Sequence, residues 1–369
     1  MTKKPSYRFA GYTESWEDSK LGECTKISAG GDLEKSKLLN NGKYPVIANA
    51  LTNDGIVGYY NDSYRIDAPA VTVTGRGDIG VAKARNVNFT PVVRLLSLKS
   101  EHDVIFLENA INIQNIVIES TGVPQLTAPQ LGRYRISFPS LPEQTAIGSF
   151  FQEIDQLISL QQRKLEVLKE QKKTYLKLLF PAKGQTKPAL RFAGFEDEWK
   201  EVKLGEVTNR YDNLRVPVSA NERISGDTPY YGANGIQDYV DGYTHDGEFI
   251  LIAEDGASDL KDYPVQYVNG KVWVNNHAHV IQGKKDLINN IFLLFAVKQI
   301  NIEPFLVGGG RAKLNSDIMM KLPLYLPTLP EQEVIGSFFQ DLDKAIGKQE
   351  EKVNQLKESK QTLLRKMFI

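Results

Sequence analysis

One long amphipathic segment occurs twice in this chain and constrains its fold more than any other feature. Residues 139–180 and 327–368 align without a gap, 188 residues apart, and more than half of the aligned residues are identical. Each copy opens with a hydroxyl residue that glutamate follows three positions later, in Ser140-x-x-Glu143 and Thr328-x-x-Glu331. This is a capping box, the signature of a helix N-terminus. The repeat therefore predicts two long helices of one design.

Apolar residues in both copies step by four and three, which is the heptad pattern of a coiled coil. The predicted seam consists of Ile147, Phe151, Ile154, Ile158, Leu165 and Leu168 in the first copy and of Ile335, Phe339, Leu342, Ile346, Val353 and Leu356 in the second. Polar residues interrupt both seams at matching places, Gln161 with Gln349 and Lys172 with Lys360. Such residues lower stability but fix the register.

The matched lengths and matched interruptions favour two helices that pack antiparallel on each other. A helix of about 36 residues is roughly 54 Å long. The pair would then hold one globular block at each end. The alternative is that each apolar face packs on its own block or on another chain.

A shorter motif precedes each variable block. Arg8-Phe-Ala-Gly returns as Arg191-Phe-Ala-Gly, and a tryptophan and a Leu-Gly-Glu string follow both copies. The blocks in between share only fragments, so the frame is duplicated while its contents differ. The predicted divisions are a first block at 1–138, a helix at 139–180, a linker at 181–190, a second block at 191–326 and a second helix at 327–369.

Both blocks are rich in predicted strands and carry one helical stretch late in the block, near 103–116 and 286–299. This composition indicates an α+β fold with mixed, strand-rich sheets. The dipeptide Asn269-Gly270 lies between two apolar runs, 265–268 and 271–274, and predicts a β-hairpin there.

Two motifs raise the question of an enzyme. Gly75-Arg-Gly-Asp-Ile-Gly80 formally matches GxGxxG after a strand, but a dinucleotide site also needs a helix to open there. The following residues look like another strand, so we predict a glycine-rich hairpin that presents Arg76. His277-x-His279 has no obvious third ligand, so a hydrogen-bonding pair is favoured over a metal site. We predict no catalytic residues, no metal site and a non-catalytic chain.

Charge and composition narrow the class of protein further. Lys plus Arg equals Asp plus Glu, at 45 each, whereas a protein that grips a long phosphate backbone alone usually carries a basic excess. Cys24 is the single cysteine, and no apolar run is long enough to cross a bilayer. We expect a cytoplasmic protein whose contact with nucleic acid is local or shared with partners.

Two variable blocks, each followed by a helix that opens with Leu-Pro-Glu-Gln, resemble the specificity subunit of a type I restriction–modification system. The strings that carry the resemblance are Phe138-Pro-Ser-Leu-Pro-Glu-Gln144, Leu326-Pro-Thr-Leu-Pro-Glu-Gln332, Gly310-Arg-Ala-Lys-Leu-Asn315 and Trp199-x-x-x-x-Leu204-Gly205. The first block departs from the pattern, with Gly122-Val-Pro-Gln-Leu126 in place of G-x-x-K-L-N.

The resemblance implies two target-recognition domains that read the halves of a bipartite, asymmetric site in double-stranded DNA. The two antiparallel helices would be the spacer between them, and the whole chain would imitate a two-fold dimer. Two DNA methyltransferase subunits, using S-adenosylmethionine, would dock on the helices, and restriction–translocase subunits, using ATP and Mg²⁺, would join for cleavage. The chain itself would hold no cofactor and make no membrane contact.

Base readout needs Arg, Lys, Asn or Gln beside a groove. Our candidates are Arg76, Lys83 and Arg85 in the first block and Lys261, Lys271, Arg311 and Lys313 in the second. For each of them a solvated surface charge is the alternative. At the level of the whole chain, the alternatives are a stand-alone DNA-binding or coiled-coil scaffold protein and a nucleotide-binding enzyme built around Gly75–Gly80.

Overall fold

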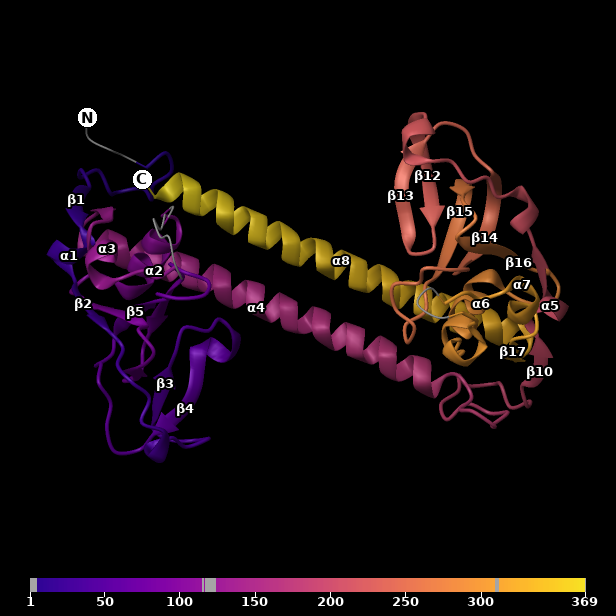
Figure 1. The fold of residues 1–369 in the computed structure, drawn as a ribbon, viewed down its shortest axis with the longest axis horizontal. Coiled ribbons are helices and arrows are strands. Elements are labelled where there is room, and N and C mark those ends of the chain that lie inside the picture. The colour runs from indigo at the N-terminus through magenta and orange to yellow at the C-terminus, as the bar shows by residue number, and fades with distance from the viewer. Residues whose placement is uncertain (1–4, 115, 117–123, 309–311, 369) are drawn as a thin grey trace. The chain divides into compact units, whose positions relative to one another are not determined.

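The computed structural model describes residues 5–114, 116, 124–308 and 312–368. The chain forms two compact units (Figure 1), and both long helices contribute to each. Unit 1 comprises Met1–Arg163 with Glu350–Ile369, and unit 2 comprises Lys164–Gln349. None of the helices in the described ranges combines the length and the apolar character that a bilayer span requires.

Unit 1 contains three small sheets and the first variable block. In the first sheet, β1 (Glu17–Lys20) pairs antiparallel with β9 (Arg135–Phe138). The second sheet has four strands in the order β2 (Lys26–Ala29), β8 (Leu96–Lys99), β5 (Ala70–Val73), β6 (Ala82–Arg85). The third has three strands in the order β4 (Ile56–Tyr60), β3 (Tyr44–Ile47), β7 (Thr90–Pro91). The helices are α1 (Leu21–Cys24), α2 (Val104–Asn112) and α3 (Ala128–Gly132), with 3-10 turns η1 (Lys35–Lys37) and η2 (Thr52–Gly55). Residues of α2 form the unit's main core with β5 and β8.

Unit 2 repeats this frame around a larger sheet. An antiparallel pair joins β10 (Lys200–Lys203) to β17 (Pro323–Leu326), and a mixed six-stranded sheet has the order β11 (Thr208–Arg210), β16 (Ala278–Gly283), β14 (His245–Ala253), β15 (Val265–Val274), β12 (Ser225–Gly232), β13 (Gly235–Val240). The helices are α5 (Leu204–Val207), α6 (Asn290–Lys298) and α7 (Ser316–Met319), with 3-10 turns η3 (Asp212–Leu214), η4 (Ala220–Glu222) and η5 (Glu303–Phe305). Residues of α6 share the main core with β14 and β16.

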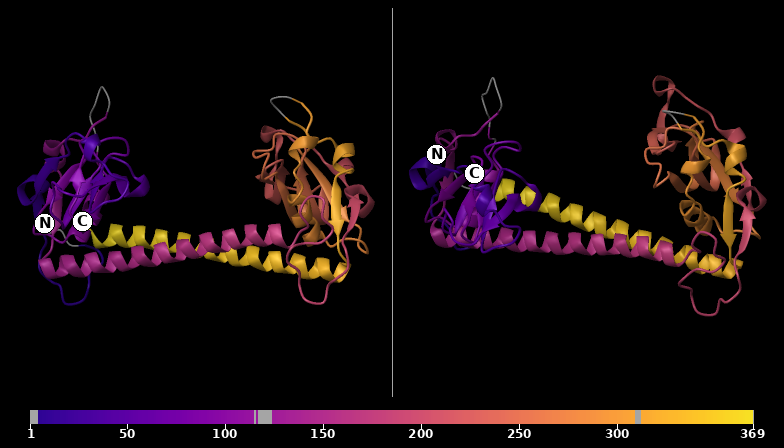
Figure 2. Two further views of the ribbon diagram at one scale, coloured as in Figure 1. Left: turned by 90° about the horizontal axis from the view of Figure 1, so that it is seen from below. Right: turned by 60° about the horizontal axis from the view of Figure 1, so that its bottom comes forward.

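The predicted long helices are α4 (Leu141–Leu178) and α8 (Leu329–Met367). Unit 1 holds the beginning of α4 and the end of α8, and unit 2 holds the reverse, as an antiparallel pair requires. In each unit the sheets lie to one side of the helical segments (Figure 2). The α+β class and the internal duplication are thereby confirmed.

A buried ion pair joins each globular block to the start of its long helix. In unit 1 both carboxylate oxygens of Glu143 accept hydrogen bonds from Arg8, each at 2.6 Å, and the Glu143 side chain is fully buried. In unit 2 Glu331 and Arg191 repeat this geometry at 2.7 Å. The two repeated motifs of the sequence, Arg-Phe-Ala-Gly and Leu-Pro-Glu-Gln, therefore bind each other.

The glutamine of each Leu-Pro-Glu-Gln string ties the long helix to the short helix of the block. The side-chain oxygen of Gln144 accepts from the amide of Asp103, the N-cap of α2, at 3.2 Å. Its amide donates to Pro139 O at 2.8 Å. Gln332 makes the same two contacts, with the amide of Asn289, the N-cap of α6, and with Pro327 O.

Ion pairs occupy the matched lysine positions of the seam, Lys172 and Lys360. Lys360 on α8 binds Asp155 on α4 at 2.6 Å within unit 1, and Lys172 on α4 binds Asp343 on α8 at 2.5 Å within unit 2. The two ion pairs are related by the internal repeat. Because each one links α4 to α8, they favour a single register between the helices.

All twelve predicted seam residues are buried or half-buried. The first two positions of each seam, Ile147 with Phe151 and Ile335 with Phe339, belong to the cores of the globular blocks. The last turns behave likewise, because the end of α4 and the residues after it enter the core of unit 2, and the end of α8 enters that of unit 1. The alternative, packing on a globular block, thus applies at both ends of the helices.

The hairpin predicted at Asn269-Gly270 is wrong. β15 runs unbroken through both residues and pairs antiparallel with β14, with Asn269 opposite Glu248 and Gly270 opposite Gly247. A type I′ turn needs positive φ at both central residues, but only Gly270 of the pair has one, at 90°. The expected helices near 103–116 and 286–299 are confirmed as α2 and α6.

Candidate nucleic-acid interface

A polar cluster lies where β14 of unit 2 ends. Glu254, the residue after β14, donates its amide to His277 O at 2.8 Å, and its own carbonyl accepts from the amide of Leu314 at 2.7 Å. Its carboxylate binds the ammonium of Lys313 at 2.6 Å. Lys313 also exchanges two backbone hydrogen bonds with Val307, each at 2.9 Å. The backbone of Lys313 and Leu314 is therefore fixed to the sheet, and we call this place the return point.

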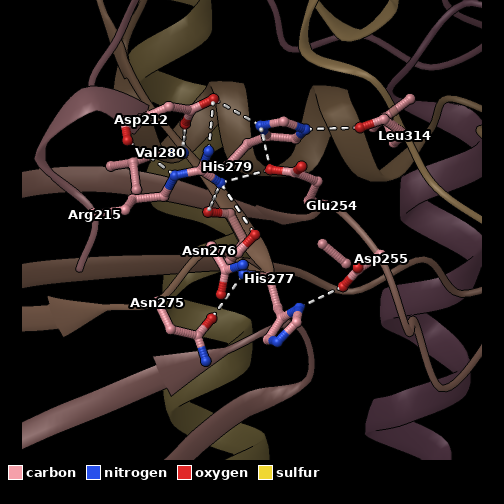
Figure 3. A network of polar contacts seen from close by, with 12 residues as sticks. Asp212, Arg215, Glu254, Asp255, Asn275, Asn276, His277, His279, Val280 and Leu314 are labelled. Atoms are coloured by element: carbon pink, nitrogen blue, oxygen red, sulfur yellow. Dashed lines mark hydrogen bonds and ion pairs between the residues drawn. The ribbon is translucent and has the colours of Figure 1, made fainter. Parts of the chain in front are cut away.

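His279, on the neighbouring strand β16, completes the fixation of this point (Figure 3). Its Nε2 contacts Leu314 O at 2.8 Å and its Nδ1 contacts Asp212 Oδ2 at 2.7 Å. A carbonyl and a carboxylate are acceptors only, so the ring donates from both nitrogens. The side chain is 1% exposed.

Arg215 neutralises the two carboxylates of this cluster (Figure 3). Its Nη1 donates to Glu254 Oε2 at 2.6 Å and to Ala278 O at 2.9 Å, and its Nε donates to Asp212 O at 3.0 Å. Asp212 accepts a further hydrogen bond from the amide of Val280 at 2.7 Å. We call His279, Asp212, Arg215, Glu254 and Lys313 the histidine cluster.

The acids of the histidine cluster titrate below their ordinary range. Burial alone would raise the pKa of Asp212, but His279, the amide of Val280 and the charge of Arg215 together outweigh it, and the pKa is lowered. Burial likewise raises the pKa of Glu254, but Lys313, Arg215 and the charge of His279 together outweigh it, and the pKa is lowered. Both carboxylates are therefore charged at neutral pH and hold their cationic partners.

Unit 1 has a counterpart of this return point with different chemistry. The amide of Leu126 donates to Gly75 O at 2.9 Å, after β5, as that of Leu314 donates to Glu254 O in unit 2. Asn49 accepts from the Gly75 amide at 2.7 Å. Arg76 Nη2 donates to Gln125 Oε1 at 3.0 Å. Here the cation is on the strand end and the uncharged partner precedes the leucine, whereas in unit 2 Lys313 precedes it.

The other two cationic candidates of unit 1 lie together on β6. Lys83 is exposed and forms an ion pair with Asp54, which lowers the pKa of that carboxyl group. Arg85 donates to Thr72 Oγ1 at 3.0 Å and is half-buried, and burial lowers its pKa. The structure therefore groups Lys83 with Arg85 beside Asp54 on β6, whereas Arg76 lies in the turn between β5 and β6.

The described candidates of unit 2 lie on different segments of the chain. Lys271 is exposed on β15, with its ammonium 4.7 Å from the centroid of the Tyr243 ring. Lys261 is exposed in a turn, where its amide donates to Asp259. Lys313 belongs to the histidine cluster, and Arg311 lies outside the described residues. Their role in base readout stays a prediction.

The glycine-rich string after β5 forms the expected hairpin turn. β6 follows it and pairs antiparallel with β5, so no helix opens there to receive a pyrophosphate. The hydrogen-bonding interpretation of the two histidines is confirmed, since His277 contacts Asp255 at 2.6 Å while His279 contacts Asp212.

Sequence reasoning missed Arg215, Glu254 and Gln125. Arg215 follows a short 3-10 turn and meets Glu254 only through the tertiary fold, so no spacing announces it. For Gln125 a signal exists, because the aligned fragments that end in Leu126 and Leu314 place it opposite Lys313.

Comparison with known proteins yields one family. The family model described as "Type I restriction modification DNA specificity domain" matches residues 13–170 and again residues 196–358. The two matches correspond to the two copies of the frame, each with its variable block and most of its long helix.

Individual relatives carry the same description. A putative type I restriction enzyme specificity subunit of Haemophilus influenzae is 51% identical over 142 residues, which are 38% of this chain and 36% of that protein. The MjaVIII specificity subunit of Methanocaldococcus jannaschii is 20% identical over 406 residues, 95% of this chain and 91% of that protein. The alignment thus spans well under two-thirds of the Haemophilus protein.

Solved structures share the fold. The S subunit of a type I restriction–modification system from M. genitalium superposes with a TM-score of 0.72 at 18% identity, over 100% of this chain and 99% of the other. A chain from a structure on complex assembly and conformational transition of the type I R-M system gives a TM-score of 0.56 at 14% identity, over 97% and 99%.

Proposed function

The chain belongs to the family of type I restriction modification DNA specificity domains, and on that premise we propose that it is the DNA sequence-recognition subunit of a type I restriction–modification complex. Each variable block would read one half of a bipartite, asymmetric site. The helices α4 and α8 would separate the half-sites. The chain would perform no catalysis itself.

The observation that carries the proposal is the duplicated joint. The Arg8–Glu143 and Arg191–Glu331 ion pairs, with the glutamines that bind the N-cap residues of α2 and α6, attach two different blocks to two equivalent helices. A frame repeated with such fidelity around unlike contents suits a protein that performs one kind of recognition on two different targets. An enzyme would not need a second copy of the frame with a different variable block.

Partners would supply the chemistry that the chain lacks. We propose that two DNA methyltransferase subunits with S-adenosylmethionine, and restriction–translocase subunits with ATP and Mg²⁺, assemble on it. The equal numbers of acidic and basic residues support a shared interface, because an isolated chain without basic excess gains little from counterion release.

The decisive experiment is to express the chain with its neighbouring methyltransferase in a host that lacks DNA methylation and to map modified adenines by long-read sequencing. We expect one bipartite motif, modified only when this chain is present. The control is the methyltransferase alone, which should modify no such motif.

A different outcome would favour the second candidate, a stand-alone DNA-binding or scaffold protein. Absence of new methylation while both proteins co-purify, together with tight DNA binding by the chain alone, would contradict the specificity-subunit proposal. Saturable nucleotide binding that Gly77→Val abolishes would support an enzyme instead, although β6 occupies the place where a phosphate-binding helix would start.

A further inference from the structure

The histidine cluster of unit 2 is more elaborate than the return point of the chain needs. In unit 1 the amide of Leu126 is fixed by Gly75 O, Asn49 supports that strand end, and Arg76 donates to the uncharged Gln125. Unit 2 uses a buried imidazole ring, two carboxylates, a guanidinium group and an ammonium group at the matching place. Removing charged groups from water costs free energy, which their pairing must offset.

We propose that His279 is a positioning residue for DNA readout by unit 2, and that it acts by holding the backbone of Leu314 and thereby the side chain of Lys313. The inference rests on the proposed function. It assigns to His279 control over selectivity at one half-site, and it assigns to Lys313 the contact with DNA.

Leu314 has both of its polar backbone groups fixed from the sheet, its amide by Glu254 O and its carbonyl by His279 Nε2. Its side chain is fully buried in the core of unit 2. The backbone from which the Lys313 side chain extends is therefore held in one orientation.

The ammonium of Lys313 is 2.6 Å from Glu254 Oε1. The other oxygen of that carboxylate, Oε2, is 2.6 Å from Arg215 Nη1 and 3.5 Å from His279 Nδ1. The Lys313 side chain nevertheless remains 46% exposed. An exposed cation held on a preorganised carboxylate presents a fixed donor to a partner, and preorganisation lowers the entropy cost of binding.

His279 is 1% exposed, so it cannot touch DNA, and any effect of its replacement on base selectivity must pass through its neighbours. Its two hydrogen bonds divide the possible roles. The bond to Asp212 stabilises the cluster, and the bond to Leu314 O fixes the return point.

Two isosteric variants separate these roles. In His279→Gln the amide nitrogen takes approximately the place of Nε2 and can still donate to Leu314 O, while the bond to Asp212 is lost. In His279→Asn the amide nitrogen takes approximately the place of Nδ1 and keeps Asp212, while the bond to Leu314 O is lost. Both variants put an uncharged carboxamide in place of the ring, which makes them matched controls for each other.

The experiment uses the complete complex of chain and methyltransferase. Binding is measured on a duplex that carries the mapped site and on duplexes with one base pair changed in either half-site, together with the melting temperature of each variant. A lost base contact costs about 1–3 kcal/mol, or roughly five- to 150-fold in affinity. We expect His279→Gln to keep its selectivity within about threefold, and His279→Asn and Lys313→Ala to lose about tenfold or more at one half-site only.

Three results would overturn the inference. The first is equal selectivity in His279→Gln and His279→Asn. The second is a loss of selectivity in both variants that follows the decrease in their melting temperatures. The third is unchanged selectivity in Lys313→Ala. If the wild-type complex already shows no sequence preference, the proposed function fails instead. Selectivity at the other half-site is the internal control, because every residue of the histidine cluster lies in unit 2.

Discussion

At the scale of single residues, the most informative side chains are buried acids with a cationic partner. Glu143 and Glu331 were assigned to helix capping from the sequence, yet both oxygens of each carboxylate accept from an arginine some 140 residues away in the chain. A bidentate arginine matches the planar carboxylate in a way that lysine cannot. Both partners occur in both copies of the repeat, and this is the feature of the sequence that indicates the pairing.

Replacement of Arg8 by alanine tests the value of this pair. Arg8→Ala leaves Glu143 charged and buried without its partner, so we expect the free energy of unfolding to fall by about 3–5 kcal/mol. The measurement is urea denaturation followed by circular dichroism. Lys187→Ala, which removes an exposed partner of Glu198 at 3.6 Å, is the control and should change stability by less than about 0.5 kcal/mol. Equal effects of the two changes would refute the assignment.

The histidine cluster predicts acid sensitivity of unit 2. The pKa values of Asp212 and Glu254 are below their usual 3.8 and 4.5 in the folded chain, so these groups stabilise the fold above those values. That stability is lost as the pH falls through the lowered folded values. Urea unfolding measured from neutral to acid pH should show this loss, and Asp212→Asn should flatten it. An unchanged pH dependence in that variant would argue against the pairing.

At the scale of elements, each long helix meets the short helix of its block through a glycine. A methyl group added at Gly148 would collide with the carboxylate of Asp103, and at Gly336 it would lie 3.2 Å from the amide of Phe292. The repeated Ile-Gly-Ser-Phe-Phe string thus records a close helix–helix approach in both units. This contact explains why a glycine persists in the interior of a helix, where alanine is otherwise more stable.

Two glycine-to-alanine changes test the approach. Gly148→Ala forces α2 away from α4 and should cost about 1–3 kcal/mol. Gly347→Ala, on α8 where nothing lies within 4 Å of an added methyl group, should leave stability unchanged or raise it by about 0.5–1 kcal/mol. Thermal unfolding of both variants is the measurement. Destabilisation by Gly347→Ala as large as by Gly148→Ala would show that the close contact is not the cause.

At the scale of the whole molecule, the duplicated helices predict a ruler. Deleting one heptad from α4 and one from α8 keeps the seam in phase and shortens each helix by about 10.5 Å, which corresponds to about three base pairs. We expect the unread spacer of the recognised site to shorten by that amount. Methylation mapping in the host described above is the measurement, and an unchanged spacer would refute the ruler. A heptad deleted from α4 alone should disrupt the Lys172–Asp343 pairing and serves as the control.

Much of the fold was predictable from the sequence by itself. The two helices and the seam rest on periodicity and on the repeat, the α+β blocks rest on runs of strand-forming residues, and the family likeness rests on short strings such as Leu-Pro-Glu-Gln. All of these are local features that a reader can see along the chain. The positions of α2 and α6 followed from the same kind of pattern.

The tertiary structure alone decided what pairs with what. Asn269-Gly270 reads as a hairpin, but pairing with β14 on one side and a parallel contact with β12 on the other keep β15 extended through it. Arg215 and His279 come together with Glu254 from three separate segments that share no spacing rule. Such contacts are set by the folded backbone, because hydrogen bonds and ion pairs depend on distances of a few ångströms that sequence separation does not encode.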